Sequence, residues 1–305
     1  KLFRSCDRSN QHVSLNRRGN FSCFLFPFSF WCTSGVIGSL TALPSASNTL
    51  LAFYAEVRSY TDKLCETLEI EDYLPQPVVD VSPPKWNIAH TTWFFEEMIL
   101  KKHFDGYKVF DDHFGYLFNS YYNSIGMRTA RDQRGALSRP TVTQVFAYRK
   151  SVDEHMRSLL SDATDASNPH SAIRNPQLLD LVILGLNHEQ QHQELMLTDI
   201  LHAFSQNPIP PAYDPAWHFP APASAGDPWA TLGEGIHTAG HTTDTFHFDN
   251  EKPAHRALVV PVRLARDLIT NAEWLAFMRD GGYSTPTLWL MDGFAAAGNE
   301  AWQAP

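Results

Sequence analysis

Four stretches of the chain carry apolar residues at the three- and four-residue spacing of an amphipathic helix. The first begins near Ser47, and the residues on its apolar side are Leu50, Tyr54, Val57, Thr61, Leu64 and Leu68. The same spacing predicts helices over residues 88–103, 141–160 and 175–204. Asn175 is a good N-cap for the last of these, and Pro176 suits its first helical position. Four such helices with loops of varied length predict an all-α, up-and-down four-helix bundle over residues 48–206.

The pattern changes after Asn207. Prolines are dense from Pro208 onward and predict a linker over residues 207–227. Beyond it, the alternating or short apolar stretches that are typical of strands lie at residues 231–237, 246–248 and 255–265. A capping box at Thr270 and Glu273 predicts a short helix over residues 271–280, ended by Gly281. We therefore expect a multi-domain chain whose second, α+β domain covers residues 228–305 and is incomplete.

The first 47 residues have a different composition from the rest. They begin with a basic stretch, continue with an apolar stretch at residues 21–32, and end in small residues. This order resembles a signal or transit peptide, although Pro27 interrupts the apolar part and the chain does not begin with Met. We expect a leader over residues 1–47 that is disordered or serves in targeting; an integral element of the fold is the remaining alternative.

Composition narrows the classes of function. The chain has 305 residues, and 24 Lys and Arg against 33 Asp and Glu give a net charge of −9. An acidic chain without a basic stripe is a poor binder of phosphate backbones, so no nucleic-acid partner is expected. No run of 18 apolar residues occurs, so no membrane partner is expected either. Cys6, Cys23, Cys32 and Cys65 form no CxxC motif, which favours a reducing compartment and a cytoplasmic location.

The most informative motif is a pair of histidines in the predicted fourth helix. His188 and His192 are four residues apart, so both imidazoles leave one face of the helix, which we predict to be the inward one. Gly185, one turn earlier, removes bulk beside them. Two imidazoles stacked one turn apart in a bundle interior can chelate a divalent metal. His90, in an apolar stretch of the predicted second helix, is the best candidate for a third ligand.

Residues 188–192, with the sequence HEQQH, also match the H-E-x-x-H pattern of zinc proteases, in which Glu189 would be the general base. Asp199 and His202 are the available third ligands for such a site, but neither has a convincing protease spacing. Three neutral imidazoles suit Zn²⁺ or Fe²⁺, and spacing does not choose between them. Glu96 and Glu97 could support the ligands or could be ordinary surface charges.

Several ordered stretches resemble the iron-dependent sulfoxide synthases of ergothioneine biosynthesis (EgtB-type). The stretches that carry the resemblance are DVSPPKW at 80–86, AHTTWFFE at 89–96, FNSYYN at 118–123, HEQQHQEL at 188–195, FDNE at 248–251, PAHR at 253–256, TN at 270–271 and LWLMDG at 288–293. The resemblance covers about residues 48–305, in order, so it is much more specific than the histidine spacing alone.

The resemblance implies a DinB-like bundle followed by the first part of a formylglycine-generating-enzyme-like (sulfatase-modifying-factor-like) domain, a C-type-lectin-related α+β fold. Family members join a thiol, cysteine or γ-glutamylcysteine, to the imidazole of Nα-trimethylhistidine with O₂ and Fe(II). The resemblance implies that His90, His188 and His192 are the iron ligands and that Gln191 lies near the substrate imidazole. Arginines of residues 128–139 could pair with a substrate carboxylate. The family's catalytic tyrosine is expected beyond Pro305, in a part of the second domain that a truncated chain would lack.

Three functions remain open from the sequence. The first is an O₂-dependent Fe(II) sulfoxide synthase, or a fragment of one with impaired activity. The second is a DinB-type Zn-dependent thiol transferase that uses the same three histidines to activate a thiolate. The third is a non-catalytic remnant that binds metal. The α+β part favours the first, because simple DinB transferases resemble only the bundle.

Overall fold

The computed structural model describes residues 46–120, 128–162, 175–218 and 227–304. The leader predicted for residues 1–47 therefore lies outside the described residues, except for its last two. Within the described part the chain divides into two units. One comprises residues 46–218 with 242–252, and the other comprises residues 227–241 with 253–304.

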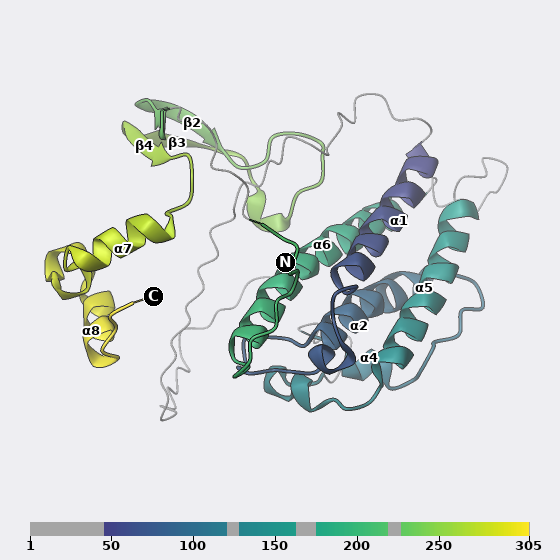
Figure 1. Cartoon of the computed structure of the whole chain (residues 1–305). Helices are drawn as coiled ribbons and strands as arrows, with labels where there is room; N and C mark the ends of the chain where they lie inside the picture. Colours follow the sequence, from purple (N-terminus) through teal and green to yellow (C-terminus); the bar gives the residue numbers. More distant parts are fainter. Residues whose placement is uncertain (1–45, 121–127, 163–174, 219–226, 305) are drawn as a thin grey trace, which may run out of the picture. The chain divides into compact units, whose positions relative to one another are not determined.

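The first unit is helical (Figure 1). Its elements are α1 (Ala46–Leu64), α2 (Pro84–Phe95), α3 (Lys101–His103), α4 (Phe114–Leu117), α5 (Val142–Asp162) and α6 (Pro176–Ser205). Short 3-10 helices lie at Ile70–Tyr73 and Arg131–Ala136, and a π-helical segment, Glu96–Leu100, joins α2 to α3. All four long helices predicted from the apolar spacing are present.

Local residue chemistry explains where the helices begin and end. α6 starts after Asn175, whose side chain accepts a hydrogen bond from the Leu178 backbone N–H, as the sequence predicts. α2 starts at Pro84, four residues before the predicted start, because a proline at the first helical position needs no N–H partner. α1 stops at Leu64 rather than reaching Leu68, since the chain turns at Cys65, whose N–H bonds the Asp62 carbonyl.

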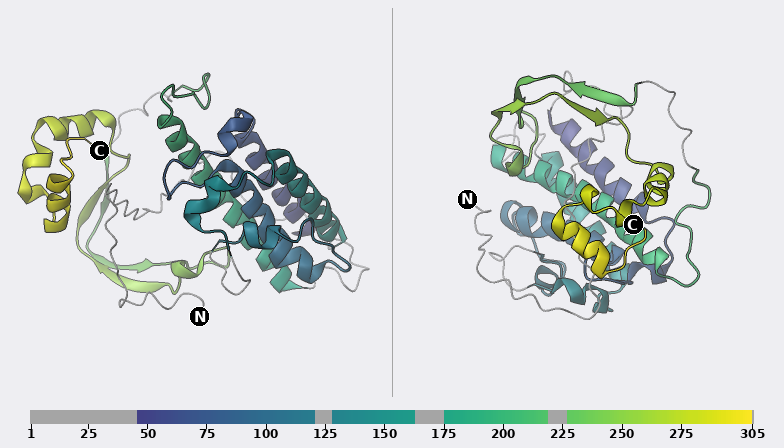
Figure 2. Two further views of the ribbon diagram at one scale, coloured as in Figure 1. Left: turned by 90° about the horizontal axis from the view of Figure 1, so that it is seen from below. Right: turned by 90° about the vertical axis from the view of Figure 1, so that its left-hand side faces the viewer.

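α2 is the centre of this unit. It packs against α5 and α6, and α1 packs against the same two helices (Figure 1, Figure 2). All twelve residues of α2 are buried, as expected of a helix that is enclosed on every side. Its aromatic residues Trp93, Phe94 and Phe95 are at most 2% exposed and form much of the core. The residues that α2 carries are thus shielded from bulk water.

The second unit is an α+β part. β1 (Trp229–Leu232) pairs antiparallel with β4 (Val262–Ala265), and β2 (Gly235–Ala239) pairs antiparallel with β3 (His255–Val259). Two helices follow, α7 (Asn271–Arg279) and α8 (Met291–Asn299). The Thr270 side chain accepts from the Glu273 backbone N–H, and Gly281 takes a left-handed conformation after α7, so both predicted helix boundaries are confirmed.

The three strand predictions in this region were wrong in detail. The stretch 231–237 is not continuous, because it divides into β1 and β2 at Gly233 and Glu234. Residues 246–248 form no strand and instead lead into a 3-10 helix, Asp249–Glu251, because the Glu251 carboxylate caps the Phe248 N–H. The stretch 255–265 is not continuous; it divides into β3 and β4 at Val260 and Pro261, and proline cannot donate to a strand ladder. Among the described residues, no helix has both the length and the apolar character needed to cross a bilayer.

Gly185 sets how closely α6 approaches α2. A Cβ atom added there would lie 2.8 Å from Phe94 Cε1 and 2.9 Å from Phe95 Cε1. We expect Gly185→Ala to lower the free energy of unfolding by about 1–3 kcal/mol, because the rings or the helices must move apart. Urea unfolding checks this, with Thr198→Ala on the exposed side of α6 as the control. Equal stability of both variants would show that the two helices have room at this contact.

Candidate metal centre

The structure brings His90, His188 and His192 together. One ring nitrogen of each lies within 4.8 Å of the corresponding nitrogens of the other two. The ring centroids are 5.1 Å apart for His90 and His188, 4.8 Å for His90 and His192, and 4.7 Å for the α6 pair. Small rotations of the rings would let one cation bind all three, since histidine nitrogens bind such ions at about 2.0–2.1 Å. Within the described residues, these three histidines form the single cluster of potential metal ligands.

Hydrogen bonds fix which nitrogen two of the rings offer. His90 Nδ1 lies 2.6 Å from the Phe118 carbonyl oxygen, and His192 Nδ1 lies 2.8 Å from Asn87 Oδ1. A carbonyl oxygen only accepts, so His90 carries its hydrogen on Nδ1 and keeps a lone pair on Nε2. The carbonyl oxygen of the Asn87 amide acts on His192 in the same way. These outer contacts are typical of histidines that bind metals.

The residues present fit a divalent transition metal. His188 Nδ1 is buried, and the structure gives it no hydrogen-bond partner among the described residues. Buried polar atoms without a partner are rare in folded proteins and often mark a site for an ion or water. Three imidazoles are also a donor set that Fe²⁺ and Zn²⁺ both accept.

Burial keeps the three imidazoles neutral. It lowers the pKa of His188 to about 4, despite the neighbouring Glu189 carboxylate. Burial also lowers the pKa values of His90 and His192 well below the ordinary range, and the proximity of His188 adds to both shifts. All three rings therefore keep an unprotonated nitrogen at neutral pH, which binding to a metal requires.

The His90 ring is stacked between two indoles of its own helix. Trp86 lies 4.5 Å from it at an interplanar angle of 15°, and Trp93 lies 5.5 Å from it at 16°. The Arg134 guanidinium carbon lies 3.4 Å from the centre of the Trp86 ring on top of this stack. Such stacking favours one orientation of the His90 ring. The spacing of the tryptophans, four residues before and three after His90, is a sequence signal that could have revealed it.

Glu189, by contrast, faces away from the histidines. Its carboxylate is fully buried and accepts from Arg58 Nη1 at 2.8 Å, Arg149 Nη2 at 2.8 Å and Thr61 Oγ1 at 2.6 Å. Burial would raise its pKa, but the two guanidinium groups outweigh burial and lower it to about 2. A carboxylate held by α1 and α5 in this way cannot act as a general base beside His188, so the zinc-protease interpretation is excluded.

The other acidic candidates also have partners outside the cluster. Asp199 accepts from the Ser82 backbone N–H at 3.0 Å. Glu96 is buried and accepts from the hydroxyls of Tyr107 and Tyr148, each at 2.6 Å, so it is not a surface charge. Asp199, Glu96 and Glu97 all lie outside the metal-ligand cluster found among the described residues.

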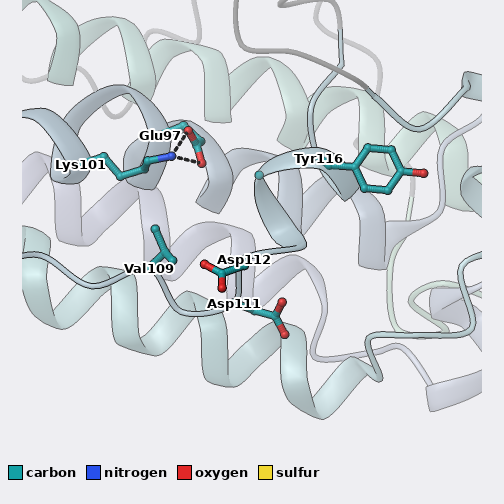
Figure 3. A pocket seen from close by; sticks show the side chains of 7 residues that line it. Glu97, Lys101, Val109, Asp111, Asp112 and Tyr116 are labelled. Carbon is teal, nitrogen blue, oxygen red and sulfur yellow. Dashed lines mark hydrogen bonds and ion pairs between the residues drawn. The ribbon is translucent and has the colours of Figure 1, made fainter.

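Glu97 lines a separate, acidic pocket. It pairs with Lys101 at 2.8 Å beside a pocket of about 270 Å³ that Val109, Asp111, Asp112, Gly115 and Tyr116 also line (Figure 3). None of the three clustered histidines lines this pocket.

The structure places Gln191 and the candidate arginines differently. Gln191 is on the exposed side of α6, between the two histidines in sequence. Arg134 is buried and donates to Ser82 Oγ at 2.8 Å and to Ser120 Oγ at 3.1 Å, in addition to its contact with Trp86. Arg128 donates to the Ser120 carbonyl at 3.0 Å. Arg134 therefore holds its part of the segment against the N-terminal end of α2, whereas Arg128, Arg131 and Arg139 are exposed.

Parts of the chain are similar to a known protein family and to two known proteins. Residues 54–196, which contain all three histidines, match the DinB superfamily. The chain is 37% identical over 116 residues to the hercynine oxygenase of Mycolicibacterium smegmatis, covering 37% of this chain and 26% of that protein. It is 33% identical over 145 residues to the hercynine oxygenase of Mycolicibacterium thermoresistibile, covering 46% of this chain and 30% of that protein. The resemblance to ergothioneine sulfoxide synthases is confirmed, although the matches span less than a third of the relatives' length.

Glu189 is expected to be a major determinant of stability. Glu189→Gln keeps the shape of the side chain but leaves two guanidinium groups buried without their shared carboxylate. We expect the free energy of unfolding to fall by about 3–5 kcal/mol at neutral pH, the usual cost of breaking a buried pair. Glu194→Gln, on the exposed side of the same helix, is the matched control and should change stability little.

The stability that Glu189→Gln loses should also depend on pH, and it should become smaller as the pH falls. The Glu189 pKa falls from 4.5 to about 2 on folding, so its stabilising effect is complete above pH 4.5 and disappears between there and pH 2. The difference in stability between wild type and Glu189→Gln should narrow over that window. A difference in stability that stays constant down to pH 2 would contradict the claim that Glu189 is ionised in the folded protein.

Proposed function

We propose that this chain carries the metal-binding part of a non-haem Fe(II) sulfoxide synthase of ergothioneine biosynthesis. The reaction would join a thiol, cysteine or γ-glutamylcysteine, to the imidazole of Nα-trimethylhistidine with O₂. The observation that carries the proposal is the cluster of His90, His188 and His192 within the DinB-superfamily stretch. Similarity to two hercynine oxygenases supports this choice of reaction.

In this proposal the domains follow the boundaries expected from the sequence. Residues 48–206 are a DinB-like four-helix bundle, residues 207–227 a linker, and residues 228–305 the first part of a formylglycine-generating-enzyme-like domain. The helical unit and the α+β part support this order. The ligands all come from the first unit, so metal binding is assigned to the bundle.

Fe(II), when bound, would supply the redox chemistry with O₂ that no amino-acid side chain provides. The chain's own residues would hold the metal and shape its surroundings. His90, His188 and His192 would bind it through neutral imidazoles, because burial prevents their protonation. Trp86 and Trp93 would exclude water from both faces of the His90 ring. Gln191, exposed on α6 between the paired ligands, would contact the substrate imidazole.

Two other functions share the same three histidines. A DinB-type Zn-dependent thiol transferase would use them to activate a thiolate, and the donor set alone suits zinc as well as iron. A non-catalytic metal-binding remnant would need only the cluster. The α+β part and the hercynine oxygenase relatives favour the sulfoxide synthase over both.

Removal of either α6 histidine should abolish iron retention. His188→Ala and His192→Ala each leave two protein ligands, which are too few to hold Fe(II) through gel filtration. His202→Ala, on the same helix but outside the cluster, is the control and should retain the metal. Metal analysis after anaerobic loading measures the difference. Full iron occupancy in His188→Ala would overturn the assignment of the ligands.

The reaction itself is tested with iron-loaded protein, Nα-trimethylhistidine, O₂ and each thiol in turn. A sulfoxide product that depends on O₂, detected by mass spectrometry, is the expected result. Gln191→Ala should raise the KM for Nα-trimethylhistidine while iron content stays unchanged. Thiol transfer by zinc-loaded protein without O₂ consumption would instead support the transferase, and metal binding without any product would support the remnant.

A further inference from the structure

We infer that Asn87 is a positioning residue for the metal centre: its side-chain oxygen holds His192 in the tautomer that presents Nε2 to the metal. This inference rests on the metal centre of the proposed function but not on the reaction. Asn87 lies in α2 and is 2% exposed. Its Oδ1 is 2.8 Å from His192 Nδ1, although the two residues are 105 positions apart in the chain.

The surroundings of the Asn87 amide determine its orientation. The oxygen and nitrogen of an amide have nearly the same shape, so the orientation must come from the hydrogen-bond partners. Asn87 Nδ2 lies 3.1 Å from the Ser82 carbonyl oxygen, which can only accept. This acceptor therefore takes the amide nitrogen, and the oxygen is left to face His192.

This orientation decides the tautomer of His192. Because Oδ1 only accepts, His192 Nδ1 must carry the hydrogen, and the lone pair must lie on Nε2. The Ser82 segment that holds the amide is itself fixed, because the Ser82 backbone N–H donates to the Asp199 carboxylate at 3.0 Å and so ties α6 to the segment before α2. The Ser82 hydroxyl also accepts a hydrogen bond from Arg134 Nη1 at 2.8 Å. The fixed neighbours of Asn87 thus orient its amide, and the amide sets the tautomer of His192.

The hydrogen-bond partner of His192 Nδ1 is a side chain, which a substitution can remove. The corresponding hydrogen bond of His90 goes to the backbone carbonyl of Phe118, which no substitution removes. His188 Nδ1 has no hydrogen-bond partner among the described residues. Substitution of Asn87 consequently tests the role of this contact without altering any of the three proposed ligands.

The test compares Co(II) binding to the full chain and its variants by competition with a chromophoric chelator. Asn87→Leu has a similar size but no acceptor, and we expect its affinity to fall about 10–100-fold. Asn87→Asp keeps an acceptor on His192 Nδ1, and its affinity should stay within about threefold of wild type or rise, because carboxylate–histidine–metal contacts strengthen the ligand. Thr91→Val is the control, since Thr91 is buried in the same helix and its hydroxyl bonds the Ile88 carbonyl of that helix at 3.2 Å.

Equal affinity of Asn87→Leu and wild type would overturn the inference, and so would an equal loss in Asn87→Leu and Asn87→Asp. A second measurement reads the tautomer directly from the ¹⁵N shifts of His192 in the metal-free protein. The expected result is hydrogen on Nδ1 in wild type and in Asn87→Asp. Hydrogen on Nε2 in wild type would overturn the inference. A wild-type protein that binds no Co(II) or Fe(II) would refute the metal centre, whereas the tautomer would still decide the role of Asn87.

Discussion

Glu189 is held between Arg58 of α1 and Arg149 of α5, and this buried contact determines how α6 is rotated. All three side chains are at most 2% exposed, so their charges need compensation, which the Glu189 carboxylate shares with Asp153 beside Arg58 and Asp62 beside Arg149. Gln193, one turn further along α6, adds a hydrogen bond to the Val57 carbonyl at 2.8 Å. Successive residues of a helix differ by about 100° in direction. With Glu189 and Gln193 directed to α1 and α5, His188 and His192 are directed to α2.

This arrangement corrects the simplest interpretation of the α6 pattern. The fully buried positions of α6 include Val182, Glu189, Gln193 and Met196, whereas His188 and His192 are partly buried beside them. The histidines therefore flank the buried stripe rather than forming its centre. That position suits a binding site, because a ligand at the edge of a core can be reached without unfolding it.

α2 contributes differently, through its complete enclosure. Its indoles hold the ring of His90, its asparagine bonds His192, and Phe94 lies 5.1 Å from the ring of His188. One buried helix thus supports all three histidines. The π-helical segment that follows it places Glu96 among the hydroxyls of Tyr107 and Tyr148, which fixes the far end of the same helix. Rigid support of this kind is what a site with a defined ligand geometry requires.

The sequence by itself determined the helices, the caps of α6 and α7 and the α+β character of the later part, because helical spacing, N-caps and capping boxes act within a few residues. It also singled out His90, His188 and His192, since the i,i+4 pair is a local signal and His90 stands in an apolar stretch of the predicted second helix. Tertiary structure alone decided that Glu189 binds two arginines, that Asn87 bonds His192, and that Arg134 stacks on Trp86. These contacts join residues between 40 and 131 positions apart in the chain. No local pattern encodes them, because they exist only once α1, α2, α5, α6 and the 3-10 helix Arg131–Ala136 have packed together.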